Sequence, residues 1–296
     1  ALLGQAPTTP AIEMLGMGGE FEVTEDTRIA LTGAPMRAQV DGTKLAWNAS
    51  HRLAAGSKLT IGPALQGTYG YLHIGGGLSS EMRLGSKSAH LSAGIGGLLE
   101  TGDALEIEED HGTQCGDYLD QPDRFEGGEI RVVPSFQTPL FSSSVVRRFQ
   151  ATPMVKDARA NRMGVKLTSE GEGFQATDGK NILSEAIVPG DIQITGDGTP
   201  FVLMAECQTV GGYPRIATVL PCDLPKVAQA PAGAKLTFRF VDMAEAVAIE
   251  RDAANDRAEL PRKMRPLIRD PRTMSDLLSY NLISGMILLL DRSIKP

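Results

Sequence analysis

The sequence predicts a mainly β protein, with two packed β domains in tandem and a helical C-terminal segment. Many short runs of alternating apolar and polar residues stand between turn signals, and the 296 residues include 33 glycines and 18 prolines. Strands at this density, with few helical patterns, are typical of closed or packed antiparallel β structure. At about 100–200 residues per domain, the length favours two domains.

The local patterns predict individual strands. Asp41-Gly42 stands between two alternating runs and indicates a hairpin, because both residues tolerate a positive φ. A short pattern, Gly-x-x-Leu-x-Ile/Phe, begins at Gly56, Gly102 and Gly233 and is typical of a turn that leads into a half-buried strand. Further strands are expected at residues 21–31, 58–61, 69–74, 104–108, 130–133, 201–205, 216–220 and 235–241.

Composition shifts divide the chain into four parts. Residues 1–110 are expected to form the first β domain and residues 130–241 the second. Residues 111–129 lack apolar periodicity and are rich in Gly, Asp and Gln, which predicts a linker. Residues 242–296 are expected to form a helical extension.

Three patterns describe this extension. Asp242 and Glu245 have the spacing of a capping box, so a helix is expected to begin there. Pro261, Pro266 and Pro271 predict an extended stretch over residues 261–272. An apolar stripe then recurs at helical spacing, formed by Met274, Leu277, Leu278, Leu282 and Met286.

Charge and hydropathy exclude several classes of protein. The net charge of −7 argues against a nucleic-acid binder with a broad basic face. The apolar run at residues 286–290 is far shorter than the roughly 20 residues that span a bilayer. No signal peptide is recognisable, so a cytoplasmic protein is expected. The chain begins with Ala, which leaves open a missing N-terminal part of the first domain.

Cysteine and histidine usage argues against disulfides and metals. The three cysteines are widely spaced, without a C-x-x-C pair, and favour isolated thiols in a reducing compartment. The four histidines all lie within the first 111 residues and lack zinc-ligand spacing. We therefore expect no metal site.

The glycine-rich runs at residues 75–77 and 94–97 fit neither nucleotide-binding motif, so they are turns or a backbone-amide anion site. The loop at residues 206–215 is more unusual, because it brings Gln208, Thr209 and Tyr213 together around Gly211-Gly212. It is either a hairpin with satisfied polar groups or one wall of a pocket for a small amide or carboxylate.

Other candidates also lie in the second domain. Asn161 and Arg162 place an amide beside a guanidinium, which suits carboxylate or phosphate recognition. Glu185 is a candidate general base or pairing partner, and Gln193 is a further donor and acceptor. The alternative for each residue is a structural role, such as an Arg162–Glu185 ion pair.

Several of these segments together carry a family resemblance. Residues 84–88 (LGSKS), 161–164 (NRMG), 183–193 (LSEAIVPGDIQ) and 208–214 (QTVGGYP) resemble the family of C-type 5-oxoprolinase subunits. This family is also labelled KipA-like, allophanate hydrolase subunit 2, or urea-amidolyase-related carboxyltransferase domain. The resemblance covers about residues 1–241. The chain departs from the family pattern at Cys207, where Arg is usual, and at Arg215, where Lys is frequent.

The resemblance implies two tandem cyclophilin-like β-barrels in a subunit that works with a smaller B-type, KipI-like partner. It also implies an ATP-dependent complex, with an A-type subunit in some relatives, that opens 5-oxoproline to glutamate. A second hypothesis is a carboxyltransferase component for urea or a related amide, with biotin on another chain. A third is a KipA-like regulator without catalysis.

Under the first hypothesis, the substrate-binding candidates are Asn161, Arg162, Gln193, Gln208, Thr209 and Tyr213. The catalytic candidates are Arg162, Glu185 and Tyr213. We expect Arg162, Gln208 and Tyr213 to converge on one pocket, and the isolated chain to be inactive because no complete nucleophile–base set or nucleotide loop is visible.

Overall fold

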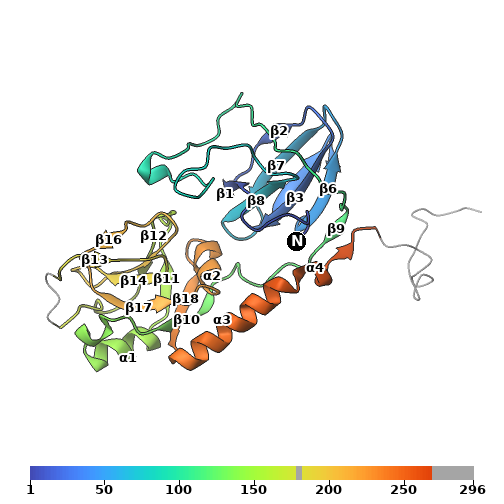
Figure 1. Ribbon diagram of the computed structural model, residues 1–296. Helices are drawn as coiled ribbons and strands as arrows, with labels where there is room; N and C mark the ends of the chain where they lie inside the picture. Colours follow the sequence, from blue (N-terminus) through green and yellow to red (C-terminus); the bar gives the residue numbers. More distant parts are fainter. Residues whose placement is uncertain (178–181, 269–296) are drawn as a thin grey trace, which may run out of the picture.

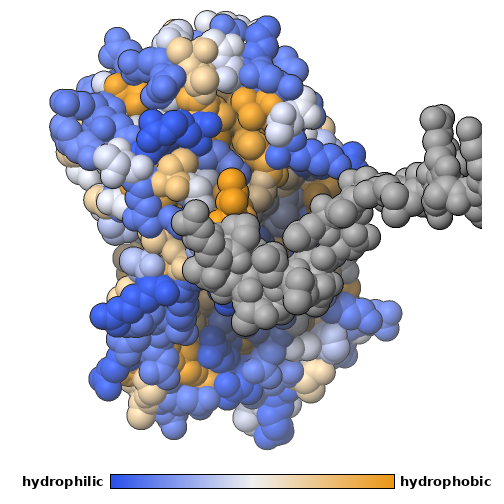
Figure 2. Space-filling view, turned by 90° about the vertical axis from the view of Figure 1, so that its right-hand side faces the viewer, coloured by the Kyte–Doolittle hydropathy of each residue, from blue (hydrophilic) through white to orange (hydrophobic). Residues whose placement is uncertain are grey.

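The computed structural model describes residues 1–177 and 182–268, and it confirms the mainly β prediction with two domains (Figure 1). In the view of Figure 1 the first domain lies above the second. The space-filling view shows the same two lobes, with a largely hydrophilic surface and hydrophobic side chains interspersed on the upper one (Figure 2).

The first domain holds its apolar core between two sheets. One sheet has the order β1-β8-β3-β6-β9-β19 and the other the order β2-β7-β4-β5. The core uses alternate residues of the strands, such as Ile29 and Leu31 of β3, and Leu72 and Ile74 of β8. The strands are β1 (Ala11–Leu15), β2 (Glu20–Glu22), β3 (Thr27–Gly33), β4 (Met36–Val40), β5 (Thr43–Lys44), β6 (Ala49–Leu53), β7 (Lys58–Ala64), β8 (Tyr69–Ile74), β9 (Asp117–Tyr118) and, from the C-terminal segment, β19 (Arg265–Pro266).

The strands of the first domain form two separate sheets and not one continuous series of hydrogen-bonded neighbours, as in a closed barrel. Gly33 has a φ of 76°, and an added Cβ there would lie 2.5 Å from the Tyr69 carbonyl oxygen. The chain therefore turns at Gly33, and β4 pairs with β7 of the second sheet instead of continuing beside β3. The predicted hairpin at Asp41-Gly42 is present between β4 and β5.

The second domain is a closed barrel with the order β10-β17-β14-β15-β12-β11-β18. Helix α1 packs on it through Phe149, whose ring stacks on Phe238 at 5.0 Å between centroids. The barrel strands are β10 (Gly128–Val133), β11 (Met154–Lys156), β12 (Gly164–Thr168), β14 (Asp191–Ile194), β15 (Pro200–Leu203), β17 (Arg215–Val219) and β18 (Lys235–Phe240). The further elements are η2 (Thr138–Leu140), α1 (Ser143–Ala151), α2 (Leu224–Gln229), and a two-stranded ribbon of β13 (Glu185–Ala186) and β16 (Val210–Gly211).

Three segments of the two domains depart from the sequence predictions. The strand predicted at residues 21–31 is two strands, β2 and β3, which belong to different sheets. The run at residues 104–108 forms only an isolated bridge between Leu78 and Ile107, because it lies in a long excursion that also contains η1 (Leu91–Ala93). The predicted linker 111–129 contributes β9 to the first sheet and buries Phe125, so part of it belongs to the first domain.

The C-terminal segment crosses from the second domain to the first (Figure 1). The predicted helix start is confirmed, since Asp242 Oδ1 accepts a hydrogen bond from the Glu245 amide in α3 (Met243–Ala258). The prediction of an extended stretch from residue 261 is wrong at its beginning. Pro261 lies in the first turn of α4 (Leu260–Lys263), where the missing N–H costs nothing, and β19 (Arg265–Pro266) then pairs with β9.

The apolar stripe from Met274 to Met286 and Pro271 lie outside the described residues. Among the helices that the structure describes, none combines the length and the apolar character needed to cross a membrane.

Candidate functional site

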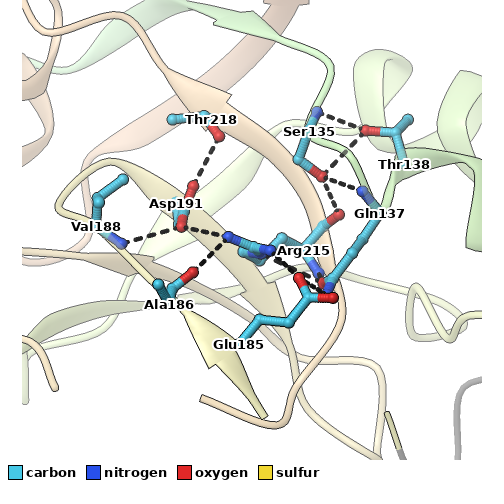
Figure 3. A network of polar contacts seen from close by, with 9 residues as sticks. All are labelled: Ser135, Gln137, Thr138, Glu185, Ala186, Val188, Asp191, Arg215 and Thr218. Atoms are coloured by element: carbon cyan, nitrogen blue, oxygen red, sulfur yellow. Dashed lines mark hydrogen bonds and ion pairs between the residues drawn. The ribbon is translucent and has the colours of Figure 1, made fainter. Parts of the chain in front are cut away.

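A cluster of polar side chains lies beside the β13–β16 ribbon in the second domain (Figure 3). We call it the Arg215 cluster. It consists of Gln137, Glu185, Asp191 and Arg215, which Figure 3 shows, and of Gln193, which lies opposite Arg215 in the strand pairing. Glu185 begins β13 of the ribbon, while Asp191 begins β14 and Arg215 begins β17. Because β14 and β17 are antiparallel neighbours, Arg215 lies opposite Gln193 and Asp191 lies opposite Thr218. Residues up to 78 positions apart therefore face one another.

Arg215 is at the centre of this cluster, and its exposed fraction is only 9%. Its Nη2 donates to Glu185 Oε2 at 2.6 Å, and its Nη1 donates to the Ala186 carbonyl at 2.9 Å. Nη1 also lies 3.3 Å from Asp191 Oδ2. Gln137 connects Arg215 to Glu185, because its Oε1 accepts from the Arg215 amide and its Nε2 donates to Glu185 Oε2 at 2.8 Å. The guanidinium is thus satisfied and fixed.

Gln193 is the exception in this ordered network. It is buried on β14, and its Nε2 group finds no hydrogen-bond partner among the described residues. An added Cβ on Gly211 would lie 2.4 Å from that Nε2, so the amide packs directly against the glycine of the ribbon. An unsatisfied buried donor costs about 1–3 kcal/mol and calls for an explanation, such as a functional role.

The charges and free atoms of the cluster define what it can bind. One guanidinium faces two carboxylates, so the formal charge is −1. The Glu185 side chain is about half exposed, and its Oε2 takes both the Arg215 and the Gln137 bonds. Its other oxygen can accept a hydrogen bond, while the Gln193 amide can donate one. A donor and an acceptor of this kind match the N–H and C=O of a cyclic amide or a urea once the Gln193 Nε2, which is buried against Gly211, is uncovered.

Arg162 lies elsewhere, at the interface between the two domains. Its Nε donates to Glu206 Oε1 at 2.7 Å, and its Nη1 donates to Glu13 Oε1 of the first domain at 2.5 Å. Burial alone would lower the pKa of Arg162, but these two carboxylates raise it. The alternative from the sequence, that Arg162 pairs with a carboxylate, is therefore confirmed, but its partners are Glu13 and Glu206. Glu185 pairs with Arg215 instead.

Glu206 connects Arg162 to the long excursion of the first domain. Ser92 Oγ and the amides of Leu91 and Ser92 donate to its carboxylate at 2.9–3.2 Å. Burial raises the pKa of Glu206, but these hydrogen bonds and the ion pair with Arg162 outweigh it and hold the pKa at about 2. Glu206 is therefore ionised throughout the neutral range.

A cavity of about 880 Å³ lies between the domains. Its walls include Arg162 and Glu13, and also Tyr69, Tyr71 and His73, which are alternate residues of β8. Tyr71 donates to Glu13 at 3.1 Å, and burial lowers the pKa of His73 to about 4, so its ring is neutral. The second domain closes this region through the side chain of Gln229. Its Oε1 accepts from the amides of Thr68 and Tyr69, and its Nε2 donates to the Tyr69 carbonyl.

The structure divides the predicted site residues into two groups. Glu185 and Gln193 lie together in the Arg215 cluster, and the Thr209 carbonyl accepts a hydrogen bond from the Ile187 amide next to the ribbon. Gln208, Thr209 and Tyr213 are exposed on the neighbouring loop. Arg162 lines the cavity between the domains, whereas Gln208 and Tyr213 do not, so the structure does not bring these three into that cavity.

Asn161 has a structural contact. Its Oδ1 accepts from the amides of Met163 and Gly164, which shapes the turn before β12. Sequence reasoning missed Gln137, Asp191, Glu13 and Ser92. Asp191 lies within a segment that carries the family resemblance, which is a usable signal, but nothing local distinguishes the other three from surface polar residues.

The described residues contain no grouping of three His, Cys, Asp or Glu side chains that could hold a metal ion. The three cysteines are free thiols, and burial raises the pKa of each of them.

Comparisons with known proteins identify similar chains. The family model described as carboxyltransferase domain, subdomain A and B, matches residues 1–240. The C-type subunit of 5-oxoprolinase from Escherichia coli is 33% identical over 260 residues, which cover 85% of this chain and 81% of that protein. The protein of the same name from Haemophilus influenzae is 32% identical, with 84% and 81% covered. The urea amidolyase of Saccharomyces cerevisiae is 27% identical over 80% of this chain and 14% of its own length.

Solved structures show the same fold. The crystal structure of TTHA0988 matches with a TM-score of 0.73 at 30% identity and covers 80% of this chain. The match includes only 47% of the TTHA0988 chain, so this chain spans less than half of that protein. The urea amidolyase of Kluyveromyces lactis matches with a TM-score of 0.78 over 91% of this chain and 18% of its own, at 22% identity, which shows the fold alone.

Proposed function

The chain belongs to the carboxyltransferase domain family, subdomains A and B, and from this membership we propose that it is a subunit of an ATP-dependent amide hydrolase. The substrate in this proposal is 5-oxoproline, which is opened to glutamate, and the partners are a B-type, KipI-like subunit and an A-type subunit. Relatives named as 5-oxoprolinase subunits, urea amidolyase and urea carboxylase place the chain in a group of amide hydrolases and carboxylases.

One observation carries the proposal. The two proteins named as the C-type subunit of 5-oxoprolinase match the chain over more than four fifths of its length and of theirs. The urea-processing relatives match at lower identity and are several times longer than this chain.

The Arg215 cluster supports an amide substrate. In the proposed complex the Gln193 amide donates to the carbonyl oxygen of the lactam, and Glu185 accepts from the ring N–H. The Gln193 Nε2 is covered by Gly211 in this structure. A half-turn of the amide about its last side-chain bond, or a small shift of the ribbon, gives the substrate access to it. The hydrogen bond to the carbonyl oxygen would strengthen as negative charge develops on that oxygen. Thr209 and Tyr213 flank the same ribbon and are proposed as the outer wall of the site.

The carboxylate of 5-oxoproline needs a cation, and the cluster does not supply a free one. Arg215 is already paired with Glu185 and Asp191, and Arg162 is paired with Glu13 and Glu206. Bringing another carboxylate to a cluster of formal charge −1 is unfavourable. This supports a site that is completed by a partner subunit, and it is a physical reason to expect the isolated chain to be inactive.

The glycine-rich segment at residues 75–77 does not fit a nucleotide. An added Cβ on Gly75 would lie 2.2 Å from the Asp110 carboxylate, so an acidic group already lies against that turn and would repel a phosphate. The backbone of Glu108 and Glu109 packs against Gly76 in the same way. We therefore assign ATP, in this proposal, to a partner subunit.

The test is reconstitution. The chain and the A-type and B-type subunits from the same genome are purified, and glutamate release from 5-oxoproline is measured with and without ATP. Turnover by the complete set, lost when this chain is omitted, is the expected result. Turnover that does not need this chain would contradict the proposal.

The alternative is a carboxyltransferase component that acts on urea, with biotin on another chain. The relatives named urea amidolyase and putative urea carboxylase, at 27% and 26% identity, are the observation in its favour. It predicts bicarbonate-dependent consumption of urea with a biotin-bearing partner, and no release of glutamate from 5-oxoproline. Binding to a partner without either activity would favour the regulator.

A further inference from the structure

The first domain sends out a long arm whose apolar side chains are exposed. We call residues 79–109 the leucine arm; it leaves the end of β8 and reaches over the second domain (Figure 1). Apart from η1 it contains only isolated bridges. Six of its large apolar side chains are between 40% and 98% exposed: Met82, Leu84, Leu91, Leu98, Leu99 and Leu105. A group of exposed leucines on one segment is typical of a surface that another protein covers.

The arm is nevertheless held in a defined position. Leu91 and Ser92 donate three hydrogen bonds to the buried Glu206 of the second domain. Lys87 pairs with Glu108, and the bridge between Leu78 and Ile107 closes the base of the arm. A surface that is ordered in advance loses less conformational entropy when a partner binds. The arm is therefore presented as a fixed docking surface.

The charge of the arm indicates what kind of chain covers it. Residues 79–109 contain six acidic and two basic residues, and neither basic residue lies in the stretch 98–109. Glu108 and Asp110 are paired with Lys87 and Arg28, which leaves Glu100 and Glu106 among the exposed carboxylates beside the leucines. A second copy of this chain carries a net charge of −7 and would be repelled. A chain with Lys and Arg around apolar pockets is attracted instead.

We propose that the leucine arm is the docking surface for a different protein chain, whose surface has apolar pockets flanked by basic residues. Its assignment to the companion B-type subunit rests on the proposed function. Because the arm is bonded to Glu206, just before the exposed loop with Gln208 and Tyr213, the docked chain would lie next to the proposed substrate site.

The test measures binding of the purified B-type subunit by titration calorimetry. The triple variant L84S/L98S/L99S should weaken binding at least tenfold, which corresponds to about 1.4 kcal/mol. The double variant E100K/E106K should weaken it at low salt, and the difference should shrink at about 0.5 M salt because the charges are exposed. Leu65→Ser is the matched control, since Leu65 is an exposed leucine of the same domain that precedes the other end of β8.

Three results of the binding titration would overturn the docking proposal: wild-type affinity in the triple variant, an equal loss in the Leu65→Ser control, or no binding of the B-type subunit by the wild-type chain. A wild-type dimer that the triple variant separates would show that a second copy is the occupant, and would overturn it too. The proposed function fails separately, when wild-type complexes form through the arm but release no glutamate.

Discussion

Replacing Gln193 by Met should stabilise the protein and lower the turnover of the reconstituted complex. Gln193 is 8% exposed, and its Nε2 has no partner among the described residues. Met has a similar shape and no polar group, so the substitution removes the cost of an unsatisfied donor without leaving a cavity. We expect the free energy of unfolding to rise by about 1 kcal/mol.

Gln229→Met is the matched control, because Gln229 is 6% exposed and differs in being fully bonded. Its side chain satisfies the amides of Thr68 and Tyr69 and the carbonyl of Tyr69. The same substitution there leaves two backbone amides without partners, at about 1 kcal/mol each, while the Tyr69 carbonyl still accepts from the Ala34 amide, so a loss of about 2 kcal/mol is expected. The two variants should therefore differ by about 3 kcal/mol, with opposite signs.

Urea unfolding followed by circular dichroism measures both values, and the reconstituted complex reports glutamate release. For Gln193→Met we expect a raised unfolding midpoint together with at least a tenfold loss of turnover, about the effect of one lost hydrogen bond to a charged group. A loss of stability like that of Gln229→Met would refute the reasoning, because it would show that the Gln193 amide is bonded in solution. Full turnover with raised stability would refute its role in binding the substrate.

Three further predictions follow from other contacts. Gly211→Ala should lower both the unfolding midpoint in urea and the turnover, because the added Cβ would lie 2.4 Å from the buried Gln193 amide. Gly212→Ala is the control: the nearest atom to its added Cβ lies at 3.4 Å, so the midpoint and the turnover should stay close to wild type. Burial lowers the pKa of Lys156 to about 8 from 10.5, so unfolding takes up a proton between these pH values. The free energy of unfolding is measured at each pH for the wild type and for Lys156→Met. The wild-type value minus the variant value should rise by about 2 kcal/mol from about pH 7 to about pH 9.5, and a constant difference would contradict this. Arg162→Ala should cost about 3 kcal/mol at pH 7 because it leaves the buried Glu206 without its cation. The pKa of Glu206 is held at about 2, so the stability that its ionised form contributes is present above pH 4.5 and is lost as the pH falls towards 2. Urea unfolding at several pH values should therefore show that the variant loses less stability in acid than the wild type. An equal loss of stability would contradict the pairing of Arg162 with Glu206.

Much of the fold follows from local patterns. The Asp41-Gly42 hairpin, the strand at residues 69–74 and the helix start at Asp242 are all where the sequence places them. Each depends on interactions within a few residues: a turn that needs positive φ, alternation across a sheet, and a side chain that caps the next turn. Residues 104–108 have the same alternation, yet they form no strand, because no neighbouring strand provides a partner along their length.

Some residues of the candidate site could also be predicted from the sequence. Glu185 and Gln193 lie in segments that resemble a known family, and the structure places both in the Arg215 cluster. The predicted convergence of Arg162 with Gln208 and Tyr213 on one pocket is not seen at the cavity that Arg162 lines. The sequence could identify which side chains are able to carry chemistry, but not which of them are free to do so.

Only the tertiary structure decided how the charges are paired. The carboxylates that bind Arg162 lie 44 and 149 residues away, and Gln137 meets Arg215 across 78 residues. Such pairs leave no mark on local periodicity, because an exposed Glu and a buried ion-paired Glu fit a polar position of the sequence equally well. The sequence by itself determined the alternation that builds two β domains, since burial of apolar side chains acts at every second residue. The register and the packing of those domains then determined which arginines are neutralised, which glutamine remains unsatisfied, and which leucines face the solvent.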